Sequence, residues 1–130
     1  MEPSSDTLAV MHPFPPAPAL KFFVGETLAQ ISLDPFQVRF AFESGRALVS
    51  EERIEHVLPD GQVWRYECEA AQGAPLLLHR LLQQSVNAVE REYLCLSLTF
   101  GDHSVLRVFS ELGPYESGHF EGPDGRFTVF

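Results

Sequence analysis

The sequence predicts an α+β fold that is mainly antiparallel β, either a curved sheet or an open barrel, built from two similar halves with one short helix near 75–84. Three observations lead to this prediction. Apolar and polar residues alternate in several short stretches, most clearly in 93–109. Turn signals rich in Gly, Pro and Asp separate these stretches. The pattern of one hairpin also recurs earlier in the chain.

Residues 93–109 are predicted to form a strand, a turn and a second strand. Apolar and polar residues alternate with a period of two, which places one set of side chains on a single face. A polar turn at 101–104 separates the two strands. The apolar residues of the shared face are Leu94, Leu96, Leu98, Phe100, Leu106 and Val108.

An earlier hairpin at 36–50 matches this one. Phe42 falls on Phe100 at a spacing of 58 positions, the difference between 100 and 42. The tripeptide Pro-Asp-Gly also recurs, with Asp60 and Asp124 separated by 64 positions, the difference between 124 and 60. We interpret the chain as two pseudo-repeats, about 20–69 and 78–130. The alternative is that two hairpins merely share a binary pattern.

A proline-containing N-terminal arm at 1–19 is predicted to precede a single globular domain at 20–130. The prolines of the arm favour extended backbone. Within the domain, alternation and turn residues predict strands at 27–33, 37–43, 47–50, 54–58 and 63–68. In the last of these, Trp64, Tyr66 and Cys68 share one face.

The second half begins after a small-residue linker at 70–74. Pro75 suits the first turn of a helix, and leucines at spacings of three and four predict a helix that ends near Gln84. A helix that continues through Glu92 is the alternative, but the repeat favours a strand at 85–91. The final strands are predicted at 115–121 and 126–130.

The acidic composition narrows the classes of partner. The net charge is −9, with 18 acidic and 9 basic residues. Phosphate backbones and anionic membranes repel such a surface, so we expect neither a nucleic acid nor a membrane partner. The same charge suits a basic protein partner.

The N-terminus and the cysteines predict the cellular compartment of the protein. The N-terminus has neither a basic region nor a long apolar run, which predicts a cytoplasmic protein without a secretory signal. Cys68 and Cys95 are both within predicted strands, and we expect free thiols in a reducing compartment.

Catalytic signatures are scarce. The chain has no GxSxG, phosphate loop, CxxC or HExxH motif, so we assign no catalytic residue, metal or cofactor. His56 and His119 lie just before the two Pro-Asp-Gly turns, and they could approach each other with Glu52 or Glu116 if the halves pair. Two solvated or strand-end histidines are the simpler interpretation.

The densest cluster of chemical groups lies late in the chain. Tyr115, Glu116 and His119 supply a phenol, a carboxylate and an imidazole within five residues. On a strand, however, Tyr115 and His119 point to one side and Glu116 to the other. The candidate binding residues are therefore these three together with Glu52 and Trp64, and a structural role for each remains open.

The chain resembles a family of small uncharacterised bacterial domains of unknown function. The resemblance rests on Val24-Gly25-x-Thr27-Leu28-x-x-Ile31, Val38-x-Phe40-x-Phe42, Glu51-Glu52 and Tyr115-Glu116-Ser117. It implies a bacterial, cytoplasmic domain without an established activity. The proline-rich arm departs from the family pattern.

The function that the sequence predicts is that of a non-catalytic, acidic protein-binding module. Its size and charge are similar to those of immunity proteins, which neutralise toxins. The alternative is a small-molecule-binding protein or enzyme with a cleft between the two halves. A homodimer through an exposed edge strand, such as 126–130, is a further possibility.

Overall fold

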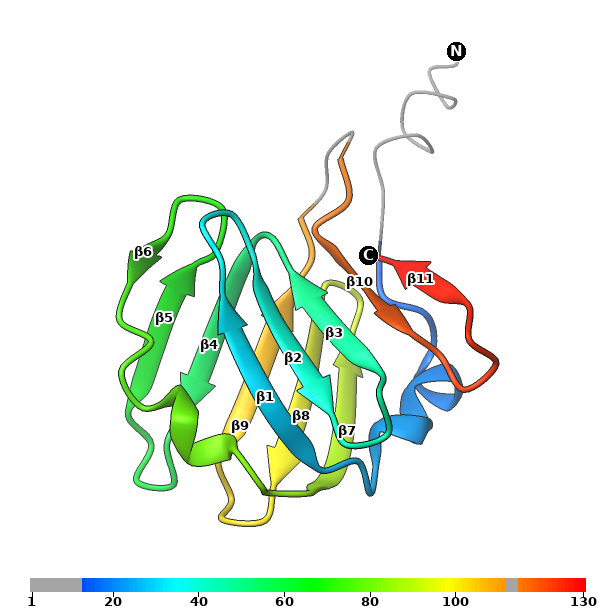
Figure 1. Cartoon of the computed structure of the whole chain (residues 1–130), viewed down its shortest axis with the longest axis horizontal. Helices are drawn as coiled ribbons and strands as arrows, with labels where there is room; N and C mark the ends of the chain where they lie inside the picture. The colour runs from blue at the N-terminus through cyan, green and yellow to red at the C-terminus, as the bar shows by residue number, and fades with distance from the viewer. Residues whose placement is uncertain (1–12, 112–114) are drawn as a thin grey trace.

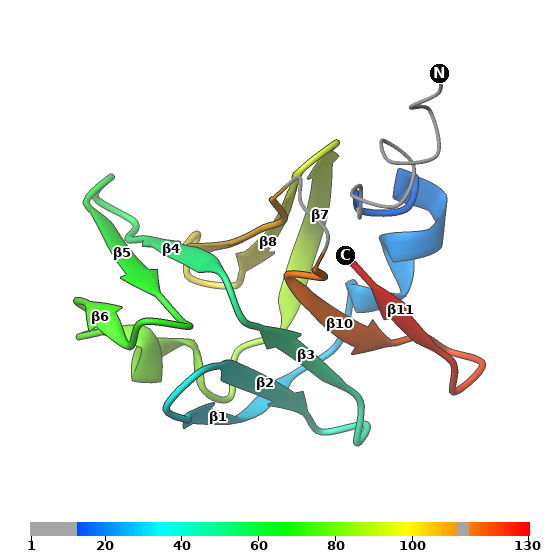
Figure 2. The same cartoon turned by 90° about the horizontal axis from the view of Figure 1, so that it is seen from above.

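The computed structural model describes residues 13–111 and 115–130. Two antiparallel sheets form two layers around an apolar core (Figures 1 and 2). The five-stranded sheet has the order β1-β2-β3-β10-β11, and the six-stranded sheet has the order β6-β5-β4-β9-β8-β7. Each sheet ends in two edge strands. The mainly antiparallel prediction is confirmed, but the sheets are open and do not close into a barrel.

All strands are short, as the spacing of the turn residues predicted. They are β1 (Leu28–Leu33), β2 (Val38–Phe42), β3 (Ala47–Ser50), β4 (Arg53–Val57), β5 (Val63–Glu67), β6 (Gln72–Gly73), β7 (Val86–Glu92), β8 (Cys95–Phe100), β9 (Val105–Phe109), β10 (Gly118–Glu121) and β11 (Phe127–Val129).

The chain passes from the five-stranded sheet to the six-stranded sheet and later returns. Strands β1, β2 and β3 start the five-stranded sheet, and the chain then crosses to the other sheet for β4, β5 and β6. Strands β7, β8 and β9 remain in that second sheet, and β10 and β11 return to the first. Each sheet is therefore built from an early and a late part of the chain, and neither part can form a sheet of its observed width alone.

Local details of the two three-stranded parts recur at a spacing of 58 positions. The amide N–H of Phe42 donates to the carbonyl of Arg46 at 2.9 Å, and that of Phe100 donates to Ser104 at 2.8 Å. A bulge interrupts the β1–β2 ladder after Leu28, and another interrupts the β7–β8 ladder after Val86. The two hairpins therefore share turn geometry as well as hydrophobic pattern.

The two parts meet just before β1 and β7. Thr27 and Ser85 form an isolated antiparallel bridge, and their hydroxyls lie 2.8 Å apart. Reciprocal backbone bonds flank this bridge: the amide of Gly25 donates to Val86, and that of Gln83 donates to Leu28. The junction between the parts is thus a backbone contact between one sheet and the other.

The core lies between the sheets, where the alternating apolar residues point. Buried side chains on the inner faces include Val38, Phe40, Phe42, Leu48, Leu96, Leu98, Phe100, Leu106 and Val108. The face predicted for 93–109 is confirmed from Leu96 onward. The strand β8 begins at Cys95 rather than at Tyr93, whose side chain is 48% exposed in the β7–β8 turn.

The helical prediction needs correction. The segment predicted as a helix at 75–84 contains only the 3₁₀-helix η2 (Leu78–Leu81). The longer helical element is another 3₁₀-helix, η1 (Ala17–Phe23), which begins within the predicted arm at 1–19. Pro18 suits the first turn of η1, and Leu20 and Phe23 bury its inner side.

The end of the predicted arm packs against the domain. Phe14 is 1% exposed, and its ring stacks on Phe130 with centroids 4.4 Å apart. Its amide N–H donates to the carbonyl of Tyr93 at 3.1 Å. The remainder of the arm, 1–12, lies outside the described residues.

Two further boundaries differ from the prediction. The strand predicted at 115–121 starts only at Gly118, because the backbone of Ser117 turns toward Phe130 and both N–H groups of Ser117 and Gly118 donate to the Phe130 carbonyl. The linker predicted at 70–74 contains the short strand β6, which pairs with the end of β5.

Candidate functional site

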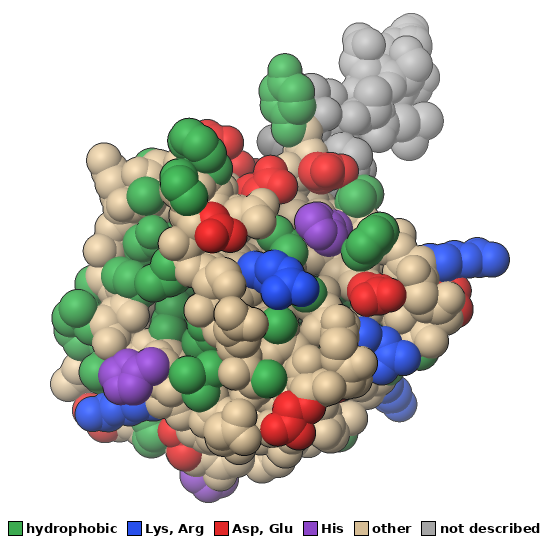
Figure 3. Space-filling view, viewed as in Figure 1, with side chains coloured by type: hydrophobic (Ala, Val, Ile, Leu, Met, Phe, Trp, Pro, Cys, Tyr) green, Lys and Arg blue, Asp and Glu red, His purple; other side chains and the backbone are tan. Residues whose placement is uncertain are grey.

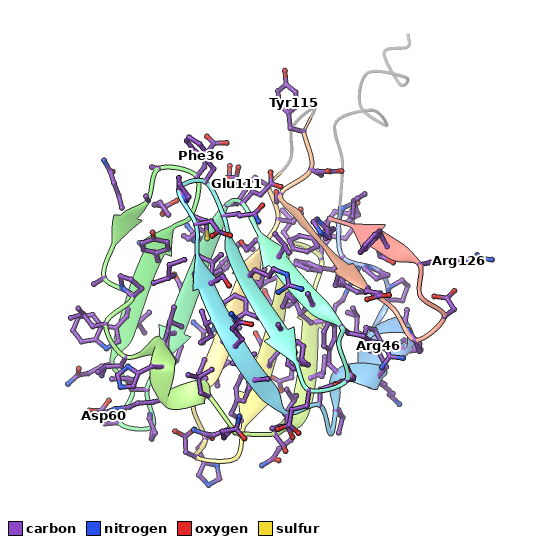
Figure 4. All side chains as sticks on the ribbon, in the orientation of Figure 1. Phe36, Arg46, Asp60, Glu111, Tyr115 and Arg126 are labelled. Atoms are coloured by element: carbon purple, nitrogen blue, oxygen red, sulfur yellow. The ribbon has the colours of Figure 1, made fainter. Side chains whose placement is uncertain are left out.

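Carboxylates gather at one end of the molecule, which we call the acidic end. Its members are Glu51, Glu52, Glu67, Glu69 and Glu111. Figure 4 places Glu111 at this end together with Tyr115 and Phe36, whereas Asp60 lies at the opposite end. The surface view shows acidic side chains close together there (Figure 3). Most of the candidate residues from the sequence lie in this region.

Backbone hydrogen bonds join the three chain segments that carry these carboxylates. The amide of Cys68 donates to the carbonyl of Glu52 at 2.8 Å, which ties the end of β5 to the β3–β4 connection. The amide of Glu51 donates to Ser117 at 2.7 Å, and that of Glu111 donates to the Ser117 hydroxyl at 2.9 Å. Hydrogen bonds donated by backbone amides therefore hold the segments of the acidic end together.

The clustering of carboxylates changes the pKa of Glu52. Burial raises the pKa of Glu52 above its usual value, and the nearby carboxylates of Glu111, Glu69, Glu67 and Glu51 raise it further. All the charges that shift this pKa are therefore negative. Like charges held together at a partly buried position store repulsion that a cation from outside can relieve.

Glu55, in β4, is surrounded by basic side chains instead of acidic ones. Its side chain is almost fully buried on the outer face of the six-stranded sheet, where Arg65 approaches at 2.9 Å and Arg107 at 3.4 Å. Arg53 lies 4.0 Å away and stacks over the Phe109 ring. Three of the chain's nine basic residues thus surround one acid here, and Arg53 also lies directly across the β4–β5 ladder from Glu67 of the acidic end.

The late cluster predicted from sequence is divided by the structure. Tyr115 is 82% exposed and projects from the acidic end, with Glu116 exposed beside it (Figure 4). His119 lies further along β10, where its ring meets Phe127 edge-on at 5.4 Å. Glu52, Tyr115 and Glu116 therefore share one end, while His119 belongs to the outer face of the five-stranded sheet.

Trp64 lies away from the other predicted residues. It pairs with His56 in the β4–β5 ladder, and His56 is 2% exposed. Neither ring nitrogen of His56, nor the ring N–H of Trp64, has a hydrogen-bond partner among the described residues. Burial lowers the pKa of His56; Asp102 raises it and Arg80 lowers it.

The burial of His56 makes the free energy of unfolding depend on pH. The folded state binds a proton at His56 less readily than the unfolded state does, so acidification below about pH 6.5 should favour unfolding. We expect His56→Phe to raise the free energy of unfolding by about 1 kcal/mol at neutral pH and by more at pH ~5.5. Urea unfolding at the two pH values measures the difference. An equal gain at both pH values would show that the pKa of His56 does not differ between the folded and unfolded states.

The histidine pairing considered from the sequence does not form. His56 lies in β4 of the six-stranded sheet and His119 in β10 of the five-stranded sheet. Over 13–111 and 115–130, no group of three or more His, Cys, Asp or Glu side chains is arranged to hold a metal ion. Cys68 and Cys95 are free and buried, as predicted, and burial raises the pKa of Cys68 to about 11.

Sequence reasoning missed Glu111, Glu67 and Glu69 as members of the acidic end. Glu67 is the last residue of β5, and Glu69 and Glu111 lie two residues beyond the ends of β5 and β9, which lie beside the start of β4 in one sheet. Acidic residues at or just after the ends of strands were the available signal, but strand order was needed to bring them together. Glu55 was also missed, although its alternation with Ile54 and His56 placed it on an outer face.

No helix within the described residues is long and apolar enough to cross a membrane. No known protein family, curated protein or solved structure matches the chain. The resemblance to small bacterial domains therefore stays a prediction.

Proposed function

We propose that this protein is a non-catalytic binding module whose acidic end holds a basic surface of a protein partner. The observation that carries the proposal is the environment of Glu52, where carboxylates from three chain segments lie close enough to raise its pKa. A partner that brings lysine or arginine side chains to this end replaces repulsion with attraction.

Exposed aromatic residues support a macromolecular partner. Tyr115 is 82% exposed and Phe36 is 70% exposed, and both lie at the acidic end (Figure 4). Aromatic side chains are enriched at the centres of protein interfaces, because they bury a large area at a small cost in conformational entropy. A surface that combines carboxylates with two exposed aromatic rings suits a basic protein better than a free cation.

An immunity-type role is the specific form of this function that size and charge favour. In that role the basic partner is a toxin, and binding to it, rather than any reaction, neutralises it. The proposal includes a cytoplasmic location, where such a partner would be met. It rests on analogy of charge and size.

A defined basic probe tests the acidic end directly. We expect a synthetic peptide of about ten residues, with lysine and alanine alternating, to bind saturably and more weakly as salt is raised. Glu52→Gln and Glu111→Gln should each weaken binding about threefold, because each removes one charge at the contact. NMR titration locates the contact by shifts at these residues, and isothermal calorimetry gives the affinity.

The matched control removes the same charge elsewhere. Glu43 is exposed in the β2–β3 turn, the turn that also holds Arg46, away from the acidic end (Figure 4). Glu43→Gln should leave the affinity unchanged. If all three variants weaken binding equally, the peptide responds only to net charge and the acidic end is not a site.

The proposal also covers the internal duplication of the chain. We propose that the chain is a duplicated unit, about 20–69 and 78–130, whose final strands are exchanged between the two sheets. The recurring turns, bulges and junction bonds at a spacing of 58 support this arrangement. His56 and Phe120 then occupy corresponding positions at the spacing of 64, which is why phenylalanine is the natural replacement for His56.

A further inference from the structure

β1 is an edge strand without a charged residue. Its sequence, LAQISL, ends the five-stranded sheet, whereas β7, VNAVERE, ends the six-stranded sheet with Glu90, Arg91 and Glu92. Charged side chains on an edge strand hinder pairing with another chain. Of these two long edges, β1 alone lacks that protection.

The β7 edge is also occupied by the chain itself. Arg91 donates from Nε to the carbonyl of Pro15 at 3.0 Å and from Nη2 to that of Phe14 at 2.6 Å. The position of β1 that corresponds to Arg91, at the spacing of 58, is Leu33, which is 53% exposed. Arg91 of β7 therefore binds a segment that covers its edge, whereas the corresponding residue of β1, Leu33, is an exposed leucine.

The backbone of β1 has a defined outward side. The amide of Asp34 donates to Gln37 at 2.9 Å, so alternation directs the polar groups of Ser32 toward β2 and those of Ile31 and Leu33 away from it. These outward groups lie beyond the bulge near Leu28, in the regular part of the ladder. They can form backbone hydrogen bonds with another strand.

The side chains of β1 complement those of a second β1. Antiparallel pairing about Ser32 sets Ile31 opposite the partner's Leu33 and the reverse, which gives two apolar pairs on the inner face. Ser32 faces itself on the outer face, so two chains of charge −9 meet without like charges at the centre of the contact. Twofold pairing requires such self-complementarity.

A groove beside β1 provides room for the incoming side chains. It has a volume of about 230 Å³ and lies between β1 and η2. Its apolar walls include Ile31, Leu33, Leu78 and Leu82. The partner's Leu33, opposite Ile31, would lie at the mouth of this groove and cover apolar surface that is now open to solvent.

We propose that β1 pairs with β1 of a second copy, antiparallel about Ser32, to form a symmetric dimer with a continuous sheet. Four backbone hydrogen bonds, from Ile31 and Leu33 of both copies, join the two chains. The edge expected from the sequence at 126–130 is less suited, because β11 has only three residues and follows the charged pair Asp124–Arg126.

Charge placed at the twofold axis tests the proposal. Wild-type protein should sediment as a dimer in analytical ultracentrifugation as its concentration approaches about 500 µM. Ser32→Glu and Ser32→Lys should each remain monomeric, because each sets like charges directly opposite one another. An equimolar mixture of the two variants should regain the dimer as a heterodimer. Circular dichroism confirms that each variant is folded.

The matched control is Val129→Lys, which adds a charge to the β11 edge, where Val129 is 42% exposed. It should dimerise as the wild type does. A wild type that stays monomeric throughout this range overturns the proposal. A dimer that survives both Ser32 variants but is lost in Val129→Lys also overturns it and assigns the contact to β11.

Discussion

Gly118→Ala is expected to destabilise the fold by about 3 kcal/mol, at the upper end of the range for overpacking a close contact. A β-carbon at Gly118 would meet the carbonyl oxygen of Val49 and the ring of Phe130, both closer than van der Waals contact allows. Both are held by packing: Phe130 is fully buried and Val49 lies in β3. The strain therefore reaches β3 and β11 together.

Urea unfolding of the wild type and Gly118→Ala measures this effect. Gly101→Ala is the matched control, because a β-carbon there meets only the Gln84 side-chain oxygen at 3.7 Å, an ordinary contact. We expect that variant to change the free energy of unfolding by less than about 0.5 kcal/mol. Equal stability of the two alanine variants would show that β10 does not approach β3 as closely as the structure has it.

The close approach of other residues to Gly118 explains why the prediction of 115–121 as a strand was only partly right. Alternation alone reads Tyr115, Ser117 and His119 as one face of a strand. In the structure, Ser117 instead binds Glu111 and Phe130, and only Gly118 is small enough to begin the pairing with β3. A close approach between strands that are distant in sequence has no local signature.

Alternation predicted the central strands well because their inner faces are fully buried. The pattern of β2 places Val38, Phe40 and Phe42 inward, and that of β9 places Leu106 and Val108 inward. A one-residue shift would turn each set to solvent, so burial and sequence specify the register together. Periodicity is therefore reliable where one face is buried and the other is not.

The exchange of strands between sheets could not be predicted in the same way. The hydrophobic pattern of β3 is satisfied equally by pairing with β4 or with β10, and the observed partner is β10. Such a choice depends on side-chain packing across more than half of the chain length. The acidic end follows from this choice, since the contact of Ser117 with Glu51 and Glu111 positions two of its segments.

The helical segments were predicted less well for a different reason. Leucines spaced by three and four predicted an α-helix at 75–84, but the same spacing also fits a single 3₁₀ turn that buries Leu78 and Leu81. The positive φ of Gln83 ends that turn and leads the chain into β7. In η1, prolines favoured the interpretation of an extended arm, although proline is also common at the start of a helix.

Phe14→Ala is expected to destabilise the fold by about 3 kcal/mol, because it removes a fully buried ring and leaves a cavity. The Phe14 ring stacks on Phe130, whose own backbone pairs with Gly118. Loss of the ring should therefore loosen β11 and the segment before η1 together. Urea unfolding gives the energy, and amide hydrogen exchange at Phe130 shows where the structure opens.

Phe36→Ala is the matched control, since the same ring is removed from a position that is 70% exposed. Its effect should stay within about 0.5 kcal/mol. Equal losses from the two substitutions would mean that residues 13–16 are the arm that the sequence predicted. A large loss confined to Phe14→Ala would make this segment part of the core, with the domain beginning near Phe14 instead of near Leu20. The β7 edge would then be covered by the chain itself, which leaves β1 from Ile31 onward as the exposed long edge among the described residues.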